Sequence, residues 1–165
     1  MSNSALAPLM VGRRQQLAAL RVALDQARAG QGQVVLLAGE AGVGKTRLLR
    51  EFAAAVAQSG DAEVYVGHCY DEQPAPPYGP FIELLRRLGG PVPALGELRR
   101  LAPAGAGRPA GDPHAERHLL FHEIYQALRP PAGAARLIIL EDLHWADQAS
   151  QDLLLYLARA IEADS

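Results

Sequence analysis

Two residues that each occur once stand side by side in this sequence. Lys45 is the only lysine among sixteen basic residues, and Thr46 is the only threonine. They end the segment Gly39-Glu-Ala-Gly-Val-Gly-Lys-Thr, which has the spacing G-x-x-x-x-G-K-[ST] of a phosphate-binding loop, the P-loop. Glycines adopt backbone angles that other residues avoid, so the N–H groups of such a loop can approach phosphate oxygens. The spacing therefore predicts a nucleotide-phosphate site.

Each residue type in this loop has a physical role. The helix that follows adds the positive end of its dipole to the anion site. Lys45 can reach the β- and γ-phosphates, and the Thr46 hydroxyl can ligate Mg²⁺. The residues expected to contact the nucleotide are Gly39, Glu40, Ala41, Gly42, Val43, Gly44, Lys45, Thr46 and Arg47. The alternative is an ordinary strand–turn–helix junction with incidental glycines.

Two adjacent acids follow an apolar run later in the chain. Glu141 and Asp142 come directly after Leu137-Ile-Ile-Leu140, at the predicted end of a strand. Hydrolysis of a nucleotide needs a placed metal ion and an oriented water, and carboxylates supply both. We expect Glu141 to hold Mg²⁺ through water and Asp142 to orient or deprotonate the attacking water. The two roles could be exchanged, because aspartate is usual at the first position.

Apolar periodicity predicts the elements that position these residues. Helical spacing predicts helices over 11–29, over the stretch after the loop, and over 81–88, 114–128 and 148–161, the last with Asp147 as its N-cap. Short apolar runs predict buried strands over 33–38, 63–67 and 136–140. Strands separated by helices indicate an α/β fold, here a P-loop NTPase fold whose parallel sheet is flanked by helices and has about three recognisable strands.

Two stretches are rich in proline. Four prolines in residues 71–80 argue against regular structure there. Residues 89–113 are rich in proline, glycine and alanine, which predicts a long surface excursion with at most a brief helix over 95–101.

The composition excludes several classes of protein. Hydrophobic residues make up 49% and charged residues 21% of the 165 residues, as in a globular domain, and the net charge is −2. A domain that binds nucleic acid mainly by neutralising phosphates would be strongly basic, so we expect no direct nucleic-acid binding. No apolar run is long enough for a bilayer, and the start of the chain lacks signal-peptide features. With Cys69 as the single cysteine, a cytoplasmic location is expected.

Three segments together resemble a known family. Met10-Val-Gly-Arg13, the stretch from Leu36 to Leu49, and Leu140-Glu-Asp-Leu-His-Trp-Ala-Asp147 resemble the AAA-type, STAND-class ATPase module. This module occurs in large LuxR-type bacterial transcriptional regulators and in origin-recognition-like ATPases. The resemblance covers residues 9–165 and implies ATP as the nucleotide, with Val11 and Arg13 near the adenine. It also implies protein partners or self-association through the module.

The resemblance further implies that this sequence is the N-terminal portion of the module. Residues 1–10 are then a flexible lead, and residues 11–165 contain the P-loop and the acidic strand. The family inserts a further strand, found later in sequence, between these two, and it also has a helical lid. Two alternatives remain: a truncated, non-enzymatic nucleotide-binding or interaction remnant, and, with less support, a small-molecule kinase.

Other candidate residues have simpler interpretations. His114, His118 and His122 recur every four residues, which could suit a metal, but their stripe lies opposite the apolar stripe, so a solvated face is expected. Cys69 has no motif partner and is expected to be a bystander. His144 and Trp145 are expected to pack the turn after the acids. The pairs Arg86-Arg87 and Arg99-Arg100 need no explanation beyond a solvated helix face.

Overall fold

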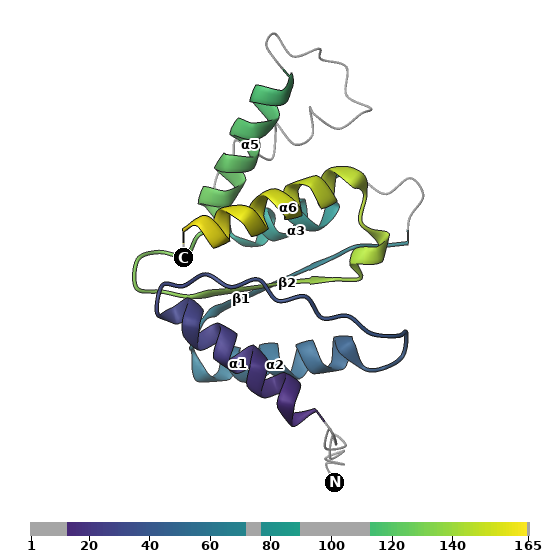
Figure 1. Cartoon of the computed structure of the whole chain (residues 1–165), viewed down its shortest axis with the longest axis vertical. Helices are drawn as coiled ribbons and strands as arrows, with labels where there is room; N and C mark the ends of the chain where they lie inside the picture. The colour runs from purple at the N-terminus through teal and green to yellow at the C-terminus, as the bar shows by residue number, and fades with distance from the viewer. Residues whose placement is uncertain (1–12, 72–76, 90–112, 165) are drawn as a thin grey trace.

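The computed structural model describes residues 13–71, 77–89 and 113–164. In this part of the chain two parallel strands form a sheet with helices on both faces (Figure 1). The elements are α1 (Arg14–Arg28), α2 (Lys45–Ser59), β1 (Glu63–His68), α3 (Gly79–Arg87), α5 (Pro113–Leu128), β2 (Arg136–Glu141), the 3₁₀ turn η1 (Leu143–Trp145) and α6 (Gln148–Ala163). Helices α1 and α2 cover one face; α3 and α6 cover the other, and α5 packs on α6 (Figure 1).

The sheet is parallel, as the alternation of strands and helices predicts. Its register pairs Glu63 with Arg136 at one end and His68 with Glu141 at the other. Parallel neighbours need a long crossover, and the chain between β1 and β2 includes α3 and α5. The carboxyl ends of both strands therefore meet at one edge, where the predicted acids lie.

Alternate strand residues divide the core between the two faces. On the α1–α2 face, Val64 and Leu137 pack against the buried side chains Leu24, Phe52 and Val56. The period of four in α2 that the sequence shows at Leu48, Phe52 and Val56 is thus its buried stripe.

The face under α3, α5 and α6 holds the larger core. The predicted apolar stripe of α5 is buried there, together with residues of α3 and α6 such as Phe81, Leu84 and Leu153. Tyr65 and Ile138 of the strands pack against this cluster. This core fixes the crossover against the sheet and so fixes the strand register.

The strand predicted over 33–38 is wrong for this structure. Residues 31–40 have no regular secondary structure, and Val34, Val35 and Leu36 are 50%, 53% and 79% exposed. In Figure 1 they belong to the dark-blue trace that runs past the sheet between α1 and α2. A strand needs a neighbour for its backbone hydrogen bonds, and these residues have no ladder partner. Two of the three expected strands form.

The remaining element predictions hold with small shifts. Asp147 caps α6 as expected, because its Oδ1 accepts a hydrogen bond from the backbone N–H of Ser150 at 3.0 Å. Helix α3 begins two residues earlier than predicted, with Pro80 in its first turn, where proline costs no helical hydrogen bond. The lead 1–10, the brief helix over 95–101 and most of the 89–113 excursion lie outside the described residues.

Charge pairs attach α1 to the turn before β1. Asp61 pairs with Arg21 at 2.8 Å and with Arg28 at 3.1 Å, and it accepts a hydrogen bond from the Ser59 hydroxyl. The Ser59 hydrogen bond, followed by the Arg21 guanidinium, lowers the pKa of Asp61 from its ordinary value of 3.8. Asp61 therefore stabilises the fold only in its charged form.

The lowered pKa of Asp61 predicts a pH-dependent contribution to stability. Because the folded state binds this proton less readily than the unfolded state, the contribution is complete above pH 3.8 and is lost as the pH falls through the lowered pKa. Asp61→Asn should therefore lower the urea midpoint by a constant amount from pH 7 to about pH 5, and the gap should narrow in acid. Asp25→Asn, at a more exposed partner of the same arginines, is the control and should show a smaller gap.

The buried stripe of α6 gives a second prediction. Leu153 is 0% exposed, whereas Leu155 on the same helix is 59% exposed. Leu153→Ala should lower the free energy of unfolding by about 3 kcal/mol, because it leaves a cavity in the core. Leu155→Ala should change it by less than about 1 kcal/mol. Urea denaturation measures both, and equal losses would contradict the packing described for α6.

Candidate functional site

The P-loop turn takes the backbone form for which its glycines are needed. Gly42 has φ 78° and Gly44 has φ 88°, both in the left-handed region. Gly44 is also the N-cap of α2, and its carbonyl accepts the N–H of Leu48 at 3.0 Å. A side chain at either position would be strained. The sequence motif therefore corresponds to a real turn that leads directly into the helix.

Lys45, the first residue of α2, folds back over this turn. Its Nζ donates hydrogen bonds to the carbonyl oxygens of Gly39 at 2.8 Å and Glu40 at 3.0 Å. The first turn of α2 has no acidic residue, so the ammonium and the helix dipole act with the same sign. Thr46 follows, half-buried, while Arg47 pairs along the helix with Glu51 at 2.9 Å. The site is locally electropositive.

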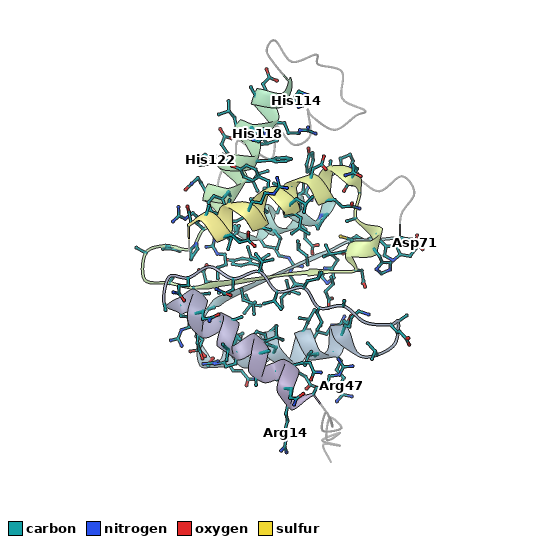
Figure 2. All side chains as sticks on the ribbon, in the orientation of Figure 1. Arg14, Arg47, Asp71, His114, His118 and His122 are labelled. Carbon is teal, nitrogen blue, oxygen red and sulfur yellow. The ribbon has the colours of Figure 1, made fainter. Side chains whose placement is uncertain are left out.

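Arg13 joins the P-loop from a distant part of the chain. It precedes α1, and its Nη2 donates a hydrogen bond to the carbonyl oxygen of Val43, thirty residues away. An added Cβ on Gly44 would lie 3.8 Å from the same guanidinium nitrogen. Its neighbour Arg14 points away from the fold (Figure 2). The structure thus brings Arg13 to the loop, whereas Val11 lies outside the described residues.

The two adjacent acids at the end of β2 occupy different environments. Glu141 is 6% exposed and faces the α2 side of the sheet, while Asp142 is exposed. Asp142 follows the strand and has a left-handed backbone, with φ 58°. Its carbonyl accepts the N–H of Trp145 at 2.9 Å. This reversal of the backbone separates two carboxylates that are adjacent in sequence.

Glu141 lines a cavity of about 240 Å³ between α2 and the sheet. Helix α2 contributes Leu49, Arg50 and Ala53, the strands contribute Val66, His68 and Ile139, and Arg87 of α3 completes the lining. Lys45 and Thr46 are not among the lining residues. Glu141 therefore faces the second and third turns of α2, and the predicted metal ligand Thr46 lies in the turn before them.

Comparison with known proteins identifies the family. The family described as AAA ATPase domain matches residues 9–165, nearly the whole chain. The chain belongs to the AAA ATPase domain family. An uncharacterized protein of Rhizobium meliloti (strain 1021) is 28% identical over 178 residues, which cover 92% of this chain. The chain spans 17% of that protein's length. No solved structure matches this chain significantly.

Membership in this family explains the geometry of the loop. An AAA ATPase domain binds a nucleotide through the P-loop, so the glycine turn and Lys45 belong to a nucleotide-binding module with a partial α/β P-loop fold. In the described residues of this AAA ATPase domain, no helix is long and apolar enough to span a membrane.

His68 is a site residue that the sequence motifs do not reveal. It ends β1, opposite Glu141, and its Nε2 lies 3.4 Å from Glu141 Oε2. Its Nδ1 lies 3.5 Å from Glu83 Oε2. The only signal in the sequence is its position directly after the strand predicted over 63–67. Pairing with Glu141 depends on a register between segments more than seventy residues apart.

Three other histidines of this AAA ATPase domain lie along α5. His114, His118 and His122 are exposed along α5, as expected (Figure 2). The ring of His118 also contacts Tyr156 of α6 edge-on, with centroids 5.9 Å apart. Within the described residues, no group of three or more histidine, cysteine, aspartate or glutamate side chains is arranged to hold a metal ion.

Cys69 fits its structural interpretation, whereas His144 and Trp145, expected to pack the turn, are both exposed. Burial raises the pKa of the Cys69 thiol, and the charges of Asp147 and Asp142 raise it further. The neutral thiol is a poor nucleophile. The rings of His144 and Trp145 lie 4.9 Å apart, next to each other in the turn after the acids.

Proposed function

We propose that this chain is the ATP- and Mg²⁺-binding part of a regulatory ATPase, which hydrolyses ATP to ADP and phosphate in its full-length context. The observation on which this rests is the glycine turn that delivers Lys45 to the N-terminus of α2, in a chain of the AAA ATPase domain family. Backbone N–H groups, the helix dipole and one ammonium then act on the same phosphates.

Lys45 is the residue that we assign to the nucleotide phosphates. Its ammonium is bound to two loop carbonyls, and both hydrogen bonds can be exchanged for phosphate oxygens carrying full negative charge. Arg13 is a second cation at the loop and supports the proposed nucleotide contact of this segment. A contact of Val11 with the adenine stays a proposal from the resemblance.

Glu141 is the better candidate for holding Mg²⁺. One of its oxygens, Oε1, is buried and has no hydrogen-bond partner, which leaves a charged acceptor available for a metal-bound water. With the Thr46 hydroxyl it makes the all-oxygen donor set that Mg²⁺ prefers, and the ion would neutralise phosphate charge. Asp142, exposed at the strand end, is then the candidate for orienting the attacking water.

Further residues of the module are proposed to complete the site. The apolar run Val34–Leu36 is solvent-exposed, and in the described residues β2 pairs with β1 alone. A strand placed between this run and β2, as in the family, would bury the run and order the start of the P-loop. The relative that this chain matches is much longer, which supports a larger assembly of domains.

The regulatory assignment follows from the resemblance to STAND-class and LuxR-type proteins. We propose a cytoplasmic signal-transducing ATPase, acting in transcription regulation, whose module binds protein partners or itself. This segment does not contact nucleic acid directly, because its net charge of −2 offers little phosphate neutralisation.

Binding of ATP should depend on Lys45. Lys45→Ala should weaken ATP binding at least about tenfold in calorimetric titrations with Mg²⁺, because it removes the cation that reaches the phosphates. Arg86→Ala, an exposed cation on α3, is the control and should bind as the wild type does. Equal affinities of wild type and Lys45→Ala would refute the phosphate site.

Turnover should depend on Asp142 in the full-length protein. Asp142→Asn should lower phosphate release by about 10²-fold or more while ATP still binds, because the attacking water loses its orienting carboxylate. Binding without any phosphate release in the wild type would favour the non-enzymatic alternative. Transfer of the γ-phosphate to an added acceptor instead of water would favour the kinase alternative.

A further inference from the structure

One polar pair ends an otherwise apolar face of the sheet. On the side that faces α2, β1 presents Val64, Val66 and His68, and β2 presents Leu137, Ile139 and Glu141. The first two rungs of this ladder are apolar on both strands. Only the last rung, at the carboxyl ends of the strands, brings two ionisable side chains together.

His68 joins two carboxylates that come from different elements. Its Nε2 faces Glu141 Oε2 at 3.4 Å, and its Nδ1 faces Glu83 Oε2 of α3 at 3.5 Å. The backbone N–H of His68 donates to the same Glu83 oxygen at 3.2 Å. Arg87, one turn further along α3, donates to the other oxygen of Glu83 at 2.7 Å. Glu83 therefore accepts a hydrogen bond at each oxygen and holds the backbone of His68, while Nδ1 lies close to it without a hydrogen bond.

The two oxygens of Glu141 have different surroundings. Oε2 faces the imidazole, whereas Oε1 is buried and without a hydrogen-bond partner. A carboxylate that is 6% exposed is costly to bury unless something of opposite polarity approaches it. The imidazole against Oε2 restricts the rotation of the carboxylate, and Oε1 stays available for another ligand. Simple packing would not require histidine, since valine fills the equivalent place at Val66.

We propose that His68 is a positioning residue that orients the Glu141 carboxylate toward the nucleotide, with Glu83 as its anchor on α3. This inference rests on the proposed function of Glu141 as the acid that holds Mg²⁺. His68 touches neither nucleotide nor metal; it acts through Glu141, as hydrogen-bond partners of metal ligands do. The contact chain Glu83–His68–Glu141 also connects α3 to the acid.

The test compares two substitutions at His68 in Mg²⁺-dependent ATP binding. His68→Leu should raise the Mg²⁺ concentration for half-maximal ATP binding about tenfold, while binding in EDTA stays unchanged. His68→Gln keeps an N–H donor and should stay within about threefold of the wild type. His122→Leu, at an exposed histidine of α5, is the matched control. Wild-type behaviour of His68→Leu, or equal damage in both His68 variants, overturns the proposal.

A second measurement decides the point without nucleotide. His68→Leu should change the folding equilibrium constant of the wild type by a certain factor. In a Glu141→Gln background that factor should be at least about threefold smaller, because the effects of two interacting residues on stability are not additive. Additive effects overturn the positioning role. If the wild type shows no Mg²⁺-dependent binding, the proposed function of Glu141 fails, and this cycle still tests whether His68 and Glu141 interact.

Discussion

The parallel register of β1 with β2 is the constraint on which the rest of this structure depends. At the amino end of β2, Arg136 donates to Glu63 at 2.7 Å. It also donates to three carbonyl oxygens at the end of α5, at 3.0–3.2 Å. The same residue therefore locks the register and ends the crossover helix. At the carboxyl end the register places His68 against Glu141. A slip of either strand by one residue would turn that strand's side chain to the opposite face, and His68 and Glu141 would no longer meet.

Local pattern sufficed for the elements whose stability is local. Helical periodicity predicted α1, α2, α3, α5 and α6, and the N-cap at Asp147 needs only a carboxylate three residues before a free N–H. The glycine turn also follows from spacing. The run 33–38 has a strand pattern just as clear as that of 136–140, yet only the second forms a strand. The difference is that 136–140 has a neighbouring strand to pair with, and the sequence of one segment alone does not reveal whether such a neighbour exists.

The residues of the proposed site divide in the same way. Lys45 and Thr46 could be found from their spacing, because the turn and the helix are contiguous in sequence. The distinct environments of Glu141 and Asp142 could not, because they arise from the left-handed backbone at Asp142 and from burial against α2. His68 was beyond reach because its contact, Glu141, lies more than seventy positions away. Arg13 was expected near the nucleotide from the resemblance alone, and its hydrogen bond to Val43 could not be predicted.

The P-loop and the exposed run before it are mechanically linked, since residue 38 leads directly into Gly39. The Nζ of Lys45 donates hydrogen bonds to the carbonyl oxygens of Gly39 and Glu40, just after that run ends. In the proposed site, phosphate would displace these contacts, so the net gain on binding would be smaller than the strength of an ammonium–phosphate pair alone. Pairing the run into a sheet would fix the backbone up to residue 38 and so hold the start of the loop in place for phosphate. Nucleotide affinity and completion of the sheet are therefore expected to rise together.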